Sequence, residues 1–163
     1  MTWRYLVRIT LYTVFLLLLQ SFLVSHFFRP ELRIDPLLAS MFGTAFVWSP
    51  LVSVVWASVW GFIVDALSGK FWGFHVGSYV VAVCLVNMTA ERFEYRNPFY
   101  QMLFVGACAL GQSGVLGLFL LFDASGPADL ATMFLSLLMR SMVMMVLAPL
   151  ITYPLWNTRG DNL

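Results

Sequence analysis

One acidic residue inside a long apolar segment is the first candidate for chemistry in this chain. Asp65 lies near the end of the apolar run Pro50–Leu67, and Ser53, Ala57 and Gly61 precede it at intervals of four residues. In a helix this spacing puts the four side chains on one face. An ionisable group at membrane depth is costly and rarely faces lipid. The sequence therefore predicts that Asp65 faces a protein interior, a cavity or a partner.

The small side chains that precede Asp65 have two interpretations. Small residues at every fourth position let helix backbones approach closely in lipid, and Gly69, Gly73 and Gly77 continue the spacing beyond the turn. Packing within the domain is the first interpretation, and a surface for the helix of another protein is the second. The spacing alone does not separate them.

Two charges lie deepest in the apolar segments, Asp65 and Arg140. Arg140 is about 16 Å from the start of its segment at 1.5 Å per residue, and a long Arg side chain can reach toward an interface. We predict an ion pair between the two, across the third and sixth helices. The alternative places Asp65 at the headgroup level, where it caps the turn at Ser68 and Gly69, while Arg140 meets a backbone carbonyl or a partner.

His75 and His26 are the two histidines of the chain. Two histidines without a cluster of carboxylates are a weak pattern for a metal site. We therefore expect no metal and no cofactor, and a local hydrogen bond for His75 at the start of a helix.

The run 111–114 reads G-Q-S-G and looks like the serine motif of rhomboid intramembrane proteases. A serine nucleophile needs a neighbouring base, and no histidine follows Ser113. We therefore expect this run to serve close helix packing and the chain not to be an enzyme.

The composition sets the class of protein that must position these residues. The 163 residues are 61% hydrophobic and 10% charged, with a mean hydropathy of +0.85, whereas soluble domains hold about 25% charged residues. No polar stretch is long enough for a separate soluble domain, so we expect one integral membrane domain, 1–163. The net charge is +1 and the Arg residues lie at segment ends, which argues against binding to nucleic acid.

Six apolar segments predict an all-α fold with about six transmembrane helices, because a helix needs about 20 residues to cross the hydrocarbon. Capping residues stand directly before prolines at 35–36, 49–50 and 97–98 and mark helix starts. The second segment would rise only about 20 Å, so it is either a short span shielded by its neighbours or half of a re-entrant hairpin. The segments are roughly 5–28, 36–48, 50–67, 71–90, 98–122 and 128–156.

The distribution of Lys and Arg predicts the orientation of these spans. With six spans, five basic residues fall on the side of the termini and three on the other side, which favours both termini in the cytoplasm. The first group is Arg4, Arg8, Arg92, Arg96 and Arg159, and the second is Arg29, Arg33 and Lys70.

Residues 61–79 resemble the rod shape-determining protein MreD family of bacteria. That family reads G-hydrophobic-D-x-x-S-G-x-x-x-G-x-H-x-x-S-Y at this place. The chain departs from the family at 48–50, where Trp-Ser-Pro replaces an Arg before Gly-Pro, and its turn at 33–36 differs from the usual R-P-D. The matching residues are Asp65, Ser68, Gly69, Gly73, His75, Ser78 and Tyr79.

The resemblance implies a non-catalytic scaffold of the cell-elongation complex in the bacterial inner membrane. Such proteins bind an MreC-like membrane protein, connect it indirectly to MreB, RodA and the elongation transpeptidase, and help to maintain rod shape and to direct peptidoglycan synthesis. The leading expectation is that the outer turn around 65–75 and the short second helix receive a segment of the partner. The candidate contact and packing residues are Asp65, Ser68, Gly69, Gly73, His75, Gly61 and Ala57.

The family is also similar in architecture to the substrate-binding S components of energy-coupling-factor vitamin transporters, six short helices around an outward-facing pocket. This similarity supplies the alternative function, a carrier for a small molecule such as a vitamin. Its site would need converging polar groups, for which Asp65, His75, Gln20 and Asn87 are the candidates.

Overall fold

A computed structural model describes residues 3–26, 34–68, 72–89, 97–122 and 130–160. These ranges form six helices and contain no strand, so the expected all-α fold is confirmed. The largest differences from the expected ends are at the fourth helix, which begins at Phe74, and at the sixth, which continues to Gly160. The helices are α1 (Trp3–His26), α2 (Pro36–Val47), α3 (Pro50–Ser68), α4 (Phe74–Thr89), α5 (Pro98–Phe122) and α6 (Leu130–Gly160).

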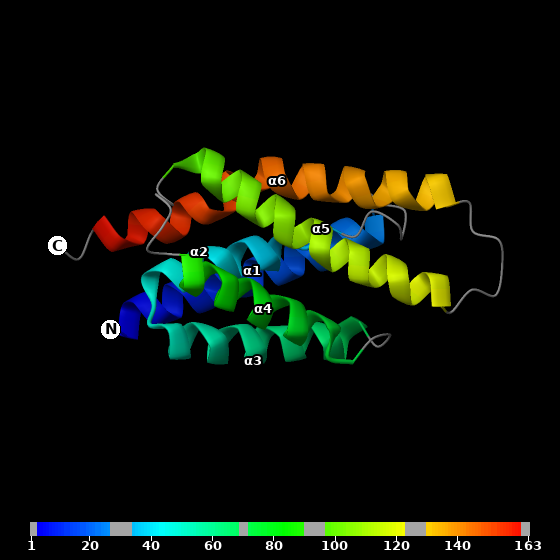
Figure 1. Cartoon of the computed structure of the whole chain (residues 1–163). Helices are drawn as coiled ribbons and strands as arrows, with labels where there is room; N and C mark the ends of the chain where they lie inside the picture. The colour runs from blue at the N-terminus through cyan, green and yellow to red at the C-terminus, as the bar shows by residue number, and fades with distance from the viewer. Residues whose placement is uncertain (1–2, 27–33, 69–71, 90–96, 123–129, 161–163) are drawn as a thin grey trace.

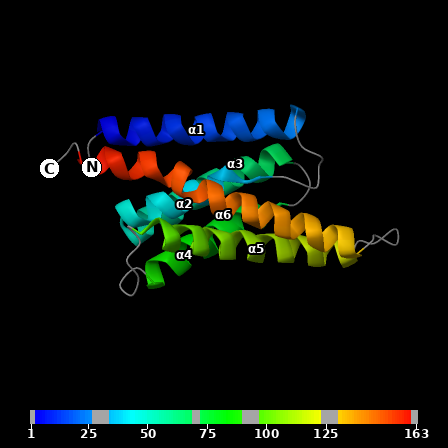
Figure 2. The same cartoon turned by 90° about the horizontal axis from the view of Figure 1, so that it is seen from above.

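The helices run lengthwise in one bundle and alternate in direction (Figures 1 and 2). Both ends of the chain lie at the same end of the bundle, which we name the terminal end, and α3 ends and α4 begins at the opposite, far end. An even number of alternating helices requires this placement of the termini.

The short helix α2 is the centre of the bundle. It contacts all five other helices, and ten of its 12 residues are buried. Twelve residues rise about 18 Å, and the neighbouring helices shield this short helix, while its crossing of the membrane stays a prediction. The expectation that α2 receives a partner is wrong, because a helix that is apolar all round is enclosed by its own bundle.

The expected caps are only partly found. Asn97 caps α5 through its side chain, since the Phe99 N–H donates to Asn97 Oδ1 at 3.0 Å. Asp35 stands at the N-cap of α2 but makes no side-chain cap hydrogen bond. Its carboxylate turns instead toward α4 and α5, and this difference leads to the second half of the site described below.

Three of the helices are long and apolar enough to cross a membrane, and the chain is therefore a membrane protein. The three candidate spans among the described residues are Pro50–Ser68, Pro98–Leu118 and Leu135–Leu155. The shorter apolar helices among the described residues are Leu6–Phe22, Pro36–Val47 and Phe74–Thr89. Large apolar side chains such as Leu51 and Leu150 are exposed on the outside of the bundle, as expected of helices that face lipid.

Candidate functional site

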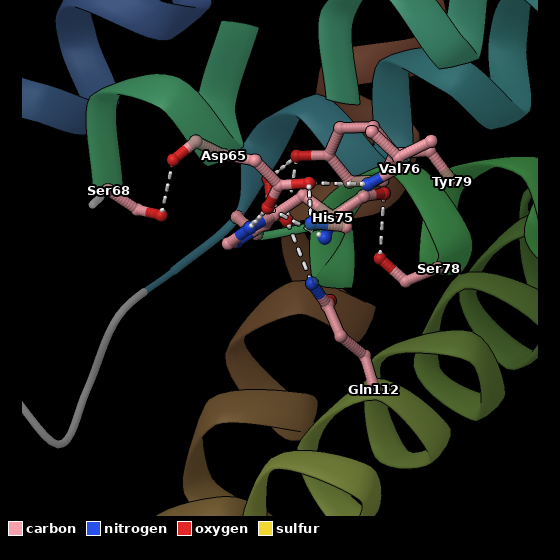
Figure 3. A network of polar contacts seen from close by, with 9 residues as sticks. Asp65, Ser68, His75, Val76, Ser78, Tyr79 and Gln112 are labelled. Carbon is pink, nitrogen blue, oxygen red and sulfur yellow. Dashed lines mark hydrogen bonds and ion pairs between the residues drawn. The ribbon is translucent and has the colours of Figure 1, made fainter. Parts of the chain in front are cut away.

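The Asp65 carboxylate is a buried acceptor for the start of the next helix (Figure 3). Its side chain is 1% exposed. Oδ1 accepts from the His75 N–H at 3.0 Å and lies 2.8 Å from His75 Nδ1. Oδ2 accepts from the N–H groups of Gly73 at 3.0 Å and Val76 at 3.2 Å. A side chain near the end of α3 thus caps α4.

The location of this cap follows from the backbone of α4. The first N–H groups of a helix have no acceptor within the helix, and the helix dipole favours a negative charge there. Gly73 has φ +87°, in the left-handed region that favours glycine. This conformation turns the chain so that its N–H and those of the first turn of α4 point at Asp65.

The hydrogen bonds at Asp65 also decide which ring nitrogen of His75 carries the hydrogen. Three backbone N–H groups donate to Asp65, and an ionised carboxylate can only accept. Nδ1 of His75 therefore carries the hydrogen and donates to Asp65. In the neutral ring Nε2 then holds a lone pair.

The row of small residues on α3 brings α4 within reach of Asp65. Ser53 and Ala57 are 0% exposed, and a Cβ on Gly61 would lie 2.6 Å from the Cα of Val76 and 2.8 Å from its nitrogen. The packing interpretation of this stripe is confirmed. The interpretation as a surface for another protein's helix is wrong for these positions, because the chain's own helices cover them.

The remaining motif residues make local contacts or lie outside the described part. Ser68 Oγ donates to the backbone oxygen of Asp65 at 3.1 Å, and Ser78 Oγ donates to that of His75 at 3.1 Å. Each hydroxyl bonds the carbonyl three residues earlier in its own helix. Gly69 lies outside the described residues.

A second buried carboxylate, Asp35, lies next to the first cluster. Asp35 is 2% exposed and accepts from the Tyr79 hydroxyl at 2.7 and 2.9 Å and from Gln112 Nε2 at 3.1 Å. Tyr79 follows His75 by one helical turn, and their ring centroids are 6.0 Å apart. One face of α4 therefore donates to two carboxylates, one on α3 and one at the start of α2.

Asp35 and Gln112 are site residues that the sequence patterns did not indicate. Asp35 before Pro36 has the sequence signature of a local cap, and Gln112 lies inside the G-Q-S-G run. The signal that could have found both is the cost of a polar side chain in an apolar segment, which favours pairing with another polar group. Ser113, beside Gln112, is 0% exposed, and its Oγ has no hydrogen-bond partner within the part of the chain that the structure describes.

Arg140 is buried, 5% exposed, and its charge lies within electrostatic range of the Tyr79 hydroxyl, as do those of Asp35 and Asp65. The hydrogen bonds of the Asp65 carboxylate described above run to the start of α4. The Asp65–Arg140 ion pair stays a prediction.

The arrangement is suited to holding helices together by directed hydrogen bonds. Across the described ranges, no three His, Cys, Asp or Glu side chains gather where they could bind a metal ion. The side chain of His26 lies outside the described part. Comparison with protein-family models, with curated proteins and with solved structures found no match.

Proposed function

We propose that this chain is a non-catalytic scaffold of the bacterial cell-elongation complex and a relative of MreD. In this proposal all six helices lie across the inner membrane, with both termini in the cytoplasm and the far end of the bundle facing outward. The chain binds an MreC-like membrane protein, and through it reaches MreB, RodA and the elongation transpeptidase.

The observation that carries the proposal is the junction of the motif residues. Asp65, Gly73 and His75, matched to the MreD pattern in sequence, form one hydrogen-bonded unit at the far end, and Tyr79 extends it to Asp35. Donors from this chain occupy both oxygens of each carboxylate. Such a unit fixes the shape of a helix end, which is what a docking platform needs.

An exposed aromatic pair lies beside this fixed turn. Trp72 is 71% exposed and Phe62 is 57% exposed, and their ring centroids are 6.1 Å apart. Aromatic side chains are enriched where proteins bind one another. We place the contact with the partner on this pair rather than on the buried stripe or on α2.

The test is co-purification from membranes that have been solubilised in mild detergent. The tagged chain should recover the MreC-like protein, and Trp72→Ala should reduce the recovery several-fold without lowering the yield of the chain. The matched control is Tyr153→Ala, since Tyr153 is also 71% exposed but lies toward the terminal end of α6. Failure of the unaltered chain to recover the partner, or equal losses in both variants, would contradict the proposal.

The small-molecule carrier is the second candidate, and one observation favours it. Asp35, Tyr79 and Gln112 converge from three separate elements, as polar groups do in ligand sites. A ligand would have to replace one of their mutual hydrogen bonds. Native mass spectrometry of the purified chain tests the carrier function. A tightly retained small molecule would favour the carrier over the scaffold.

A further inference from the structure

His75 has one ring nitrogen that the cap does not use. Nδ1 and the backbone N–H both bond to Asp65, while Nε2 makes no hydrogen bond to any residue in the described part of the chain. The side chain is 15% exposed. Nε2 therefore belongs to a ring that is mostly enclosed but reaches the surface.

An imidazole offers more than the cap requires. Asp65 already accepts from three backbone N–H groups, and an Asn side chain could supply the fourth donor equally well. The ring is also fixed in direction, by its bond to Asp65 and by edge contacts with Phe74 and Tyr79 at centroid distances of 5.3 and 6.0 Å. A carboxylate bonded to one ring nitrogen sets the tautomer and presents the other nitrogen to a ligand.

We infer that Nε2 of His75 accepts a hydrogen bond from the MreC-like partner, an inference that rests on the proposed function. Because Nε2 holds a lone pair in the neutral ring, the partner group is a donor: a hydroxyl, an amide or an indole N–H at the outer end of the partner's transmembrane helix. A carboxylate cannot fill this place, since it is acceptor-only when ionised.

Two substitutions separate this contact from the cap. His75→Asn keeps a donor near the position of Nδ1 and removes the acceptor at Nε2, whereas His75→Gln keeps a polar atom that reaches the position of Nε2. We expect His75→Asn to unfold within a few degrees of the unaltered protein but to recover at least five-fold less partner. His75→Gln should recover more partner than His75→Asn.

The outcomes distinguish this contact from the function on which it rests. Equal recovery of the partner by His75→Asn and by the unaltered chain overturns the contact alone, while no recovery by the unaltered chain overturns the proposed function. The comparison is repeated in nanodiscs of phosphatidylethanolamine and of phosphatidylcholine. Retention of phosphatidylethanolamine that depends on His75, with unchanged binding of the partner, assigns Nε2 to a lipid headgroup and also overturns the contact.

A second measurement uses only the unaltered protein. The chain has two histidines, so selective ¹⁵N-histidine labelling gives signals from only two rings. Addition of the purified partner should shift the Nε2 signal of His75, because a new donor polarises that nitrogen. An unchanged Nε2 signal at saturating partner overturns the inference.

Discussion

The two ends of α3 are stabilised in different ways. At the far end, Asp65 accepts hydrogen bonds from the turn and first residues of α4. From the terminal end to the middle of α3, Trp48, Trp56 and Trp60 pack edge to face, with ring centroids 5.0 and 5.7 Å apart. The indole nitrogens of these three tryptophans are buried and have no hydrogen-bond partner among the described residues.

The difference shows which end has a specified geometry. Hydrogen bonds to one carboxylate require several donors to lie at fixed distances and directions. Aromatic packing depends mainly on buried area and tolerates changes of shape better. Similar substitutions should therefore have much larger effects at the far end than at the terminal end, and the following predictions test this contrast.

The largest effect is expected for Asp65→Leu. It leaves the partly buried N–H groups of Gly73, His75 and Val76 without their acceptor, and we expect the free energy of unfolding to fall by about 3–5 kcal/mol. Asp65→Asn should lose less, because one amide oxygen still accepts. Denaturant titration in detergent micelles measures the unfolding free energy of both variants. If Asp65→Leu lowered it no more than Trp56→Phe does, the two ends of α3 would not differ in the way described.

Gly61→Ala should have the next largest effect. Its Cβ would lie 2.6 Å from the backbone of Val76, so α3 and α4 must separate and the Asp65 bonds must lengthen, at a cost of about 2–3 kcal/mol. Gly77→Ala is the matched control, since no atom lies within 4 Å of its Cβ position. The control should be neutral or stabilising by up to about 1 kcal/mol, because alanine favours helix over glycine.

Tyr79→Phe tests the second carboxylate. It removes the hydroxyl that donates to Asp35, while Gln112 still donates, so we expect a loss of about 1–2 kcal/mol in the same unfolding measurement. Tyr153→Phe, at a residue that is 71% exposed, should change the stability by less than about 0.5 kcal/mol. Equal effects in the two variants would show that the Asp35 hydrogen bonds contribute nothing.

The smallest effect is expected at the terminal end, for Trp56→Phe. The variant loses contact area against Trp48 and Trp60 but also removes a buried N–H for which the described ranges offer no acceptor. Because these two changes oppose each other, we expect the unfolding free energy to change by less than about 1 kcal/mol. A loss as large as that of Asp65→Leu would mean that the indole nitrogen has an essential acceptor.

The helices were predictable because apolar runs and Pro-marked starts are local features. The burial of Asp65 was also predictable, because a charge in an apolar segment is costly unless it is sheltered. The spacing of the small residues left the role of Gly61 open between internal packing and a surface for a partner. The acceptor role of Asp65 was not, since it depends on the backbone direction at Gly73 and on the donors that this turn presents.

The remaining part of the site depends on tertiary packing. Asp35 could have capped α2 locally, and only the enclosure of α2 at the centre of the bundle turns its carboxylate toward Tyr79 and Gln112. The shortness of the second segment gave shielding by its neighbours as one alternative, but nothing in the sequence indicated that Asp35 would bond to Tyr79 and Gln112. The same burial explains why α2 is not the expected surface for a partner.

The hydrogen bonds between Asp65 and the start of α4 are tested most directly by residue-resolved amide hydrogen exchange. The N–H groups of Gly73, His75 and Val76 belong to the turn and the first turn of α4, where no helical acceptor protects them. We predict slow exchange at these three amides in the unaltered protein and fast exchange in Asp65→Asn at the amides that lose their acceptor, with protection in α5 and α6 unchanged. Fast exchange at all three in the unaltered protein, or no change in the variant, would contradict the account.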